Sequence, residues 1–203
     1  MVVKRWKRSF VYGLVTLGFL AATAHVAHGA DAKGQYGVRG AALASCAMYE
    51  KERAARSEIY RMIASWMDGY ITGINQSAAD TYDIASFEST ELLAALVSEQ
   101  CKESPETTVF AIVNALTGQF AANRLHAPSE KIEVSVGDNN VLLYEEVLRR
   151  IQEELAEAGL YDGEIDGTYD AHTQQAMRSY QESIEFRPTG FPDQLTLWRL
   201  FNE

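Results

Sequence analysis

The chain has 203 residues, 18 of them basic and 28 acidic, and its formal net charge at pH 7 is −10. This length suits one or two domains. A chain this acidic lacks the basic face with which proteins bind nucleic acid or anionic lipid, so we expect no nucleic-acid partner.

The first 30 residues have the three-part pattern of a secretory signal peptide. Four basic residues among the first eight precede an apolar run from Phe10 to about Ala24, and small residues follow up to Ala30. An uncleaved membrane anchor is the alternative, but the run is shorter than the roughly 20 residues of a spanning helix. We expect export to the periplasm or cell envelope, with no stable membrane span after cleavage. Cleavage leaves 14 of the 18 basic residues and all 28 acidic ones, a net charge of −14.

The two cysteines, Cys46 and Cys101, both lie in the part predicted to be exported. An even number of cysteines in an oxidising compartment favours a disulfide, and two buried free thiols are the alternative. A bridge between them would close a loop of roughly 55 residues, which the chain-entropy model values at about 3–4 kcal/mol.

Residues 31–125 are predicted to form a first, helical domain. Residues 31–40 are polar and rich in glycine, and helical spacing of apolar residues then runs through 42–75, 91–104 and 105–125. Ser89 or Thr90 is expected to cap the second of these segments, and Pro105 to open the third. Gly69 and Gly73 lie four residues apart, which predicts a close helix contact there.

Residues 126–140 contain Pro, Gly and a polar tail, with one short alternating stretch, and we interpret them as a linker with room for one strand. Residues 141–203 are predicted to form a second domain of three short helices, with Gly159 ending the first and Asp170 capping the second. Asp193 or Thr196 should begin the third. The predicted fold class is therefore all-α, with two small helical domains.

Two Asp-Gly pairs, Asp162-Gly163 and Asp166-Gly167, follow the first helix of this second domain. A calcium loop of the EF-hand type needs oxygen ligands at alternate positions and a Glu at position 12, whereas this stretch has Asp at every fourth position. We expect instead two successive turns, in which both glycines take positive φ and both Asp side chains bond to nearby backbone.

Segment 143–203 resembles the three-helix peptidoglycan-binding domain found on many cell-wall hydrolases and envelope proteins. Its motif residues occur here in order, and they are Gln152, Leu155, Gly159, Tyr161, Asp162, Gly163, Ile165, Asp166, Gly167, Tyr169, Thr173, Ala176, Tyr180, Gln181, Phe186, Thr189, Gly190, Asp193, Thr196, Leu197 and Leu200. Asp170, where the pattern usually has Gly, and Glu185, where it has a small residue, depart from it.

This resemblance implies that the protein binds peptidoglycan. It places the contacts on the loop side of the bundle, at Tyr161, Asp166, Tyr169, Thr173, Gln181 and Thr189. The alternative for each of these residues is structural, and for Asp166 and Thr189 it is the organisation of turns.

Residues 38–125 resemble small exported helical domains of the type of the acid-stress chaperone HdeA. Cys46, Cys101 and the Trp66-x-x-Gly69-Tyr70 stretch carry this resemblance, which implies the same disulfide. The segment is less similar to helical immunity proteins that bind secreted cell-wall amidases and carry further cysteines. These resemblances imply a fold more than an activity, and we expect residues 38–125 to serve as an interaction module for one periplasmic protein partner.

The part predicted to be exported has neither the HExxH motif of zinc metalloproteases nor the Gly-x-Ser-x-Gly motif of serine hydrolases. Glu50, Glu52 and Glu58 could serve a divergent hydrolase, but a charge run on a helix is usually a solvated face. The sequence thus predicts a non-catalytic, exported peptidoglycan-binding protein without cofactor or metal. The alternatives are a divergent peptidoglycan hydrolase, its inhibitor or immunity protein, and an acid-activated periplasmic chaperone.

Overall fold

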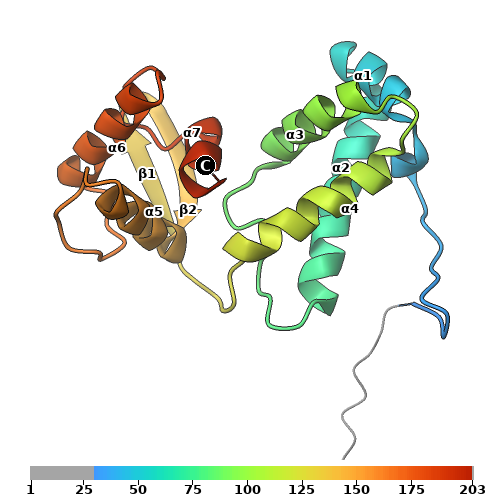
Figure 1. Cartoon of the computed structure of the whole chain (residues 1–203), viewed down its shortest axis with the longest axis horizontal. Helices are drawn as coiled ribbons and strands as arrows, with labels where there is room; N and C mark the ends of the chain where they lie inside the picture. Colours follow the sequence, from blue (N-terminus) through green and yellow to red (C-terminus); the bar gives the residue numbers. More distant parts are fainter. Residues whose placement is uncertain (1–29, 203) are drawn as a thin grey trace, which may run out of the picture. The chain divides into compact units, whose positions relative to one another are not determined.

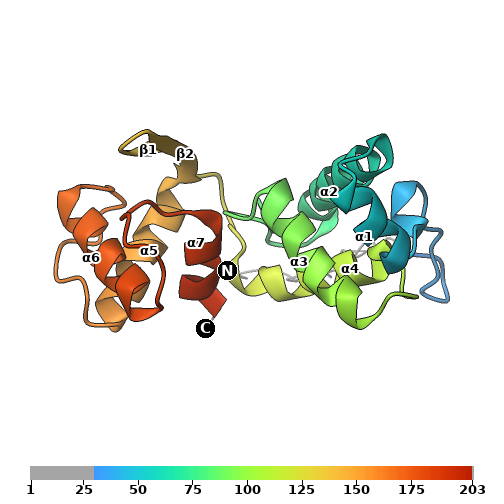
Figure 2. The ribbon, with the colours of Figure 1, turned by 90° about the horizontal axis from the view of Figure 1, so that it is seen from above.

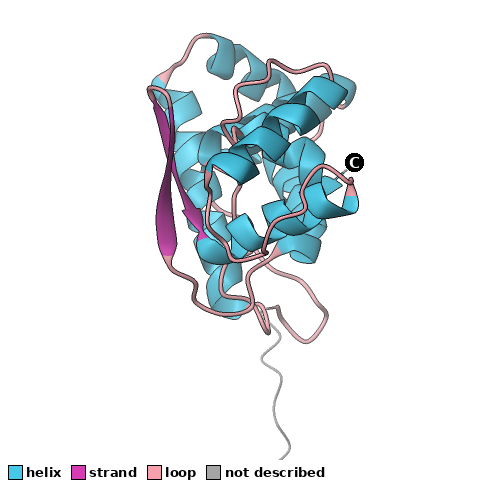
Figure 3. Ribbon diagram, turned by 90° about the vertical axis from the view of Figure 1, so that its left-hand side faces the viewer, coloured by secondary structure: helices cyan, strands magenta, loops and turns pink. Residues whose placement is uncertain are grey.

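The structure is a computed structural model that describes residues 30–202. The predicted signal peptide, residues 1–30, lies outside the described residues except for Ala30. The chain divides into two units, Met1–Tyr36 and Gly37–Glu203, and all helices and strands described below belong to the second. Helices dominate that unit, with one pair of strands (Figure 3), so the prediction of a mainly helical fold is confirmed.

The first predicted helical segment forms a short 3-10 turn, η1 (Ala41–Leu43), and two α-helices, α1 (Cys46–Ala54) and α2 (Glu58–Ser77). The break falls at Arg56, whose φ is +47°. The hydroxyl of Ser57 then accepts the backbone N–H of Tyr60 and begins α2, as that of Ser45 accepts the N–H of Met48 and begins α1.

Helix α3 (Thr90–Glu103) begins as predicted, with Ser89 as its cap. Helix α4 (Val109–Phe120) begins four residues later than predicted, with Thr108 as its cap, and runs into the 3-10 turn η2 (Ala121–Asn123). The backbone of residues 105–107 has another partner: the carbonyls of Pro105 and Thr107 accept the N–H groups of Ala47 and Cys46 at 2.9 and 2.8 Å. These carbonyls thus satisfy the free backbone N–H groups at the start of α1, and residues 105–107 do not extend α4.

Helices α1 to α4 pack around a core that contains the predicted disulfide between Cys46 and Cys101. Tyr49 is fully buried beside it and donates its hydroxyl to the carbonyl of Ala94 at 2.7 Å. The prediction of a disulfide is confirmed. The close helix contact expected at Gly69 and Gly73 is wrong, because both face solvent and an added Cβ would meet no atom within 4 Å.

Residues predicted to be a linker with one strand form an antiparallel hairpin, β1 (Lys131–Val136) and β2 (Asn139–Tyr144). Val136 pairs with Asn139 across a two-residue loop, in which Gly137 has a φ of +61°. A glycine at the first loop position is typical of a tight hairpin turn. The second strand takes residues that we expected in the next helix, which begins at Glu145.

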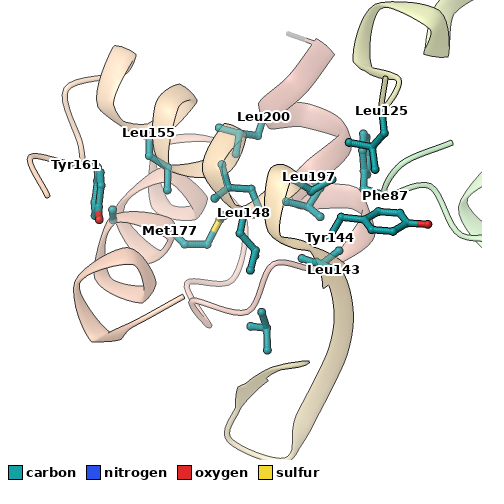
Figure 4. Close-up of a cluster of buried hydrophobic side chains, with 14 of the residues drawn as sticks. Phe87, Leu125, Leu143, Tyr144, Leu148, Leu155, Tyr161, Met177, Leu197 and Leu200 are labelled. Atoms are coloured by element: carbon teal, nitrogen blue, oxygen red, sulfur yellow. The ribbon is translucent and has the colours of Figure 1, made fainter. Parts of the chain in front are cut away.

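Three helices complete the chain: α5 (Glu145–Glu157), α6 (Ala171–Ser183) and α7 (Gln194–Asn202). Figure 1 shows them as a small bundle, and the view in Figure 2 shows the hairpin at its edge. Figure 4 shows the core of this bundle, to which each helix contributes; Leu148, Leu155, Met177, Leu197 and Leu200 belong to it.

The bundle core continues into the α1–α4 region. Phe87 and Leu125 are buried in the same cluster as the bundle residues (Figure 4), and Trp198 packs against both cores. Gln194 donates to the carbonyl of Phe87 at 2.8 Å and accepts the N–H of Ser89 at 2.7 Å. Cutting the chain between the two regions would therefore expose apolar surface, and their division into separate domains stays a prediction.

Candidate functional site

The loop between α5 and α6 is held by one buried side chain, that of Gln152 on α5. Its Oε1 accepts the backbone N–H of Gly167 at 2.8 Å. Its Nε2 lies 3.0 Å from both Asp166 Oδ1 and the carbonyl oxygen of Thr168. A single amide thus fixes three consecutive residues of the second Asp-Gly turn, and amides suit this task because they both donate and accept.

A second buried amide, that of Gln181 on α6, holds the loop between α6 and α7 in the same way. Its Oε1 accepts the backbone N–H of Gly190 at 2.8 Å, and its Nε2 donates to the carbonyl of Phe191 at 2.9 Å. Gly190 and Gly167 have φ values of +71° and +77°. The bundle therefore repeats one unit, in which a buried glutamine binds the N–H of a left-handed glycine in the following loop.

Each of these loops ends in an aspartate that caps the next helix. Asp170 Oδ1 accepts the N–H of Thr173 at 2.9 Å, and Asp193 Oδ1 accepts the N–H of Thr196 at 3.0 Å. Asp170, noted as a departure from the family pattern, is thus a helix cap. The backbone N–H of Thr173 is the main cause that lowers the pKa of Asp170.

The two glycines of the Asp-Gly pairs differ, and the expectation of positive φ for both is half right. Gly167 has it, whereas Gly163 does not. An added Cβ at Gly163 would lie 2.5 Å from the hydroxyl oxygen of Tyr161, so this glycine makes room for that ring. The Asp side chains differ as well: Asp166 Oδ1 accepts the N–H of Thr168 at 2.7 Å, as expected, but Asp162 lies 2.9 Å from His172 Nε2.

The six predicted contact residues divide by exposure. Thr173 and Gln181 are fully buried, and Tyr161 is 7% exposed. Their polar atoms serve the fold, since Tyr161 donates to the carbonyl of Glu164 at 2.8 Å. In this conformation the three present little or no side chain to a ligand.

The other three predicted contact residues reach the surface. Asp166 is exposed, and Tyr169 and Thr189 are partly exposed. Tyr169 donates to the carbonyl of Gly190 at 2.9 Å and so joins the two loops. A hydrogen bond from Gln152 is the main cause that lowers the pKa of Asp166, which keeps this carboxylate charged. That the six residues contact peptidoglycan stays a prediction.

Sequence reasoning missed two cavities that border the bundle. One, of about 480 Å³, lies between β2 and the start of α7, and its lining includes Val141, Phe191, Pro192 and Leu195. The other, of about 490 Å³, lies at the start of α5 and has a charged lining. The sequence signal for the first was the Phe-Pro turn at 191–192 followed by Leu195, which we interpreted as turn and helix alone. The structure leaves half of the Leu195 side chain exposed.

A third cavity, of about 400 Å³, lies among α2, α3 and the loop that joins them, and Asp68, Asn75, Asp83 and Glu88 contribute to its lining. Burial raises the pKa of Glu88 to about 7, and the nearby Asp83 carboxylate adds to the rise. The backbone N–H of Phe87 lies 3.2 Å from Glu88 Oε2 and opposes the rise.

Metal-binding clusters of three or more His, Cys, Asp or Glu side chains do not occur among residues 30–202. Within the same range, no helix combines the length and the apolar character needed to cross a membrane.

Comparison with known proteins identifies the bundle. Residues 145–200 match the family model described as "Putative peptidoglycan binding domain". The match begins at the first residue of α5 and ends within α7, so it covers both glutamine-held loops. The predicted peptidoglycan-binding domain is confirmed. None of the curated proteins matches the chain.

Among solved structures, the crystal structure of SltB3 from Pseudomonas aeruginosa in complex with NAG-anhNAM-pentapeptide is similar to this chain. The two have 23% sequence identity and a TM-score of 0.29, and the alignment covers 52% of this chain and 27% of that one. A likeness at this level carries no argument about fold or activity.

Proposed function

We propose, from the peptidoglycan-binding domain at residues 145–200, that this is an exported, non-catalytic envelope protein held at the cell wall by its C-terminal bundle. The match to the family model carries the proposal. The N-terminal pattern of a signal peptide and the disulfide between Cys46 and Cys101 support export to an oxidising compartment such as the periplasm.

Residues 38–125 then serve as a module for one periplasmic protein partner, as the resemblance to HdeA-like and immunity domains suggests. Because Phe87 and Leu125 share the bundle core, this module and the bundle would act as one body at the wall. When the bundle binds peptidoglycan, the module would therefore be held in the envelope with its outer surface free for a partner.

Two surfaces of the bundle are candidates for the peptidoglycan contact. The loop side, predicted from the family pattern, exposes Asp166 and 41% of Ile165. The cavity beside β2 combines the ring of Phe191 with Leu195, which is 51% exposed. Shallow apolar clefts with a few fixed polar groups are typical of ligand sites.

Co-sedimentation with insoluble sacculi tests the proposal and separates the two surfaces. Ile165→Glu and Leu195→Glu each place a charge on one surface, and Ile59→Glu on α2, where 42% of Ile59 is exposed, is the matched control. We expect the unaltered protein and Ile59→Glu to pellet, and one of the other two variants to remain soluble. A protein that does not pellet with sacculi contradicts the proposal.

One observation favours the hydrolase alternative enough to test it. Glu88, with a pKa of about 7, lies in a cavity that also contains the carboxylate of Asp83, and a raised carboxyl pKa is typical of general acids. If sacculi release soluble muropeptides and Glu88→Gln abolishes the release, the protein is a hydrolase. We expect no release, because the part predicted to be exported has no recognised catalytic motif, and Glu88 directly follows Phe87, whose carbonyl accepts a hydrogen bond from Gln194.

A further inference from the structure

The charged cavity at the start of α5 lies partly outside the matched domain. One wall comes from the first turns of α5 and the other from residues 122–130, which precede the hairpin. Its volume of about 490 Å³ falls in the range of small-ligand sites. Its lining includes three guanidinium groups and three carboxylates, those of Arg124, Arg149, Arg150, Glu130, Glu145 and Glu146.

Backbone carbonyls fix the guanidinium groups in place. Arg124 donates to Asp80 and Ala121 at 3.1 and 2.6 Å, and Arg150 donates to Asn123 at 2.7 Å. Arg149 donates to the carbonyl of Ile165 at 3.0 Å. Side chains held in this way lose little freedom when a ligand binds.

Each guanidinium keeps donors for a ligand. The group has five N–H donors, and the hydrogen bonds above, with those from Arg149 to Glu145 and from Arg150 to the hydroxyl of Ser86, use two on each arginine. The Nε of Arg150 is buried without a hydrogen-bond partner among the described residues, so a ligand in the cavity does not reach it. The other donors of these arginines remain for a ligand, and Arg124 also forms an ion pair with the carboxylate of Asp80 at 3.7 Å.

The carboxylates of the cavity complement the arginines. Glu130 and Glu146 are exposed and form no salt bridge within residues 30–202. The carbonyl of Glu130 accepts the N–H of Glu145 at 2.8 Å, and the hydroxyl of Ser129 accepts the N–H of Glu146 at 3.1 Å. These two bonds fix one wall against the other, so positive and negative groups face a common space.

We infer that this cavity binds a zwitterionic peptide, and that in the envelope this ligand is the peptide stem of peptidoglycan. The inference rests on the proposed function. Glycan chains present hydroxyl and amide groups, which do not require three cations and three anions, whereas stem peptides present free carboxylates and free amino groups. Because Arg149 also holds the carbonyl of Ile165 beside the Asp-Gly turn, a stem bound here would lie next to the glutamine-held loop. Residues 122–130 would thus add peptide recognition to the matched domain.

NMR titration of the full protein tests this directly. The probe is the free tripeptide L-Ala-γ-D-Glu-meso-diaminopimelate, and uncharged chitotetraose is its counterpart. We expect the tripeptide to perturb the amides of residues 122–130 and 145–150. Amidation of the tripeptide's carboxyl groups should weaken binding by about 10-fold or more, because each charge-assisted hydrogen bond contributes about 1.5–3 kcal/mol.

Two variants locate the site, and each is first checked for folding by its amide spectrum. Arg124→Gln removes a cation, and Glu146→Gln removes a carboxylate whose side chain is exposed, so at least the second should fold. Both should weaken tripeptide binding by roughly 5-fold or more, whereas Lys51→Gln on α1 should not change it.

The outcomes separate the two proposals. If the protein pellets with sacculi but the tripeptide causes no perturbation in these segments, the charged cavity is a structural ion-pair network and the inference fails while the proposed function stands. If the tripeptide binds but sacculi do not, the cavity recognises zwitterionic peptides and the proposed function fails. If neither binds, both fail.

Discussion

The side-chain oxygen of Gln152 accepts the backbone N–H of Gly167 at 2.8 Å, although fourteen residues separate the two along the chain. Both groups are buried, so a water molecule cannot take the place of either hydrogen-bonding partner. This contact fixes the second Asp-Gly turn against α5. Gln181 and Gly190 repeat it in the α6–α7 loop.

Gln152→Ala should destabilise the protein by about 3 kcal/mol or more. The substitution leaves the buried N–H of Gly167 without an acceptor, which costs about 1–3 kcal/mol, and it empties the space of a fully buried side chain, which adds to the loss. Asp166 and Thr168 also lose a donor, but both are exposed and can bond to water instead. Urea unfolding would measure the loss. Gln181→Ala should lose a similar amount, while Gln175→Ala, an exposed position on α6, should change stability by less than about 0.5 kcal/mol. Equal losses for buried and exposed glutamines would contradict this account.

Gly163→Ala should cost about 1–3 kcal/mol for a steric reason, since φ at this position is ordinary. The new Cβ would lie 2.5 Å from the Tyr161 hydroxyl oxygen and 2.6 Å from its Cζ. Gly159→Ala, where φ is +71° and nothing lies within 4 Å, should cost about 1 kcal/mol from backbone strain alone. In a double-mutant cycle, Tyr161→Ala should cancel much of the loss at Gly163 and none at Gly159. Independent effects of Gly163 and Tyr161 would show that the ring does not set this position.

Reduction of the disulfide should lower the free energy of unfolding by about 2–5 kcal/mol, because Cys46 and Cys101 are 55 residues apart and both lie in the core of α1 to α4. The measurement compares urea midpoints with and without a reductant, and a Cys46→Ala/Cys101→Ala double variant reports the same loss without reductant. A midpoint that reductant does not shift would mean that the bridge does not form in solution.

Stability should fall as the pH rises from about 4.5 to 7, because of Glu88. Burial raises its pKa to about 7 in the folded protein, against 4.5 ordinarily. In this window the folded state holds a proton that the unfolded chain releases, so rising pH favours unfolding, by on the order of 2 kcal/mol. Urea titrations at pH 5 and pH 8 would show this fall, and Glu88→Gln should remove most of it. Glu103→Gln, an exposed position at the end of α3, should keep it. An unchanged pH dependence in Glu88→Gln would contradict the assignment.

Local signals in the sequence predicted much of the fold. Ser89 and Asp170 cap the helices that they were expected to cap, the disulfide pairs as expected, and the motif residues of segment 143–203 predicted the domain at 145–200. Short-range chemistry decides the helix caps and the turns of the motif, so a short stretch of residues reveals them. The disulfide joins residues 55 apart, but the chain has two cysteines and therefore one possible pair.

What the sequence did not predict depends on partners far along the chain. Residues 105–107 stay out of α4 because their carbonyls bind the start of α1, and residues 141–144 stay out of α5 because they pair with β1. The burial of Thr173 and Gln181 could not be foreseen either, since a motif does not tell a ligand contact from a residue that holds a loop. The charged cavity joins residues 122–130 to α5, and no periodicity signals that juxtaposition.

Co-sedimentation of residues 31–203 with purified sacculi tests the central claim most directly. The measurement is the fraction of protein that pellets as sacculi are added, with the supernatant analysed for released muropeptides. The account predicts saturable pelleting, competition by soluble muropeptides and no release. Protein that stays in the supernatant at every sacculus concentration, while its amide spectrum shows a folded bundle, would contradict it.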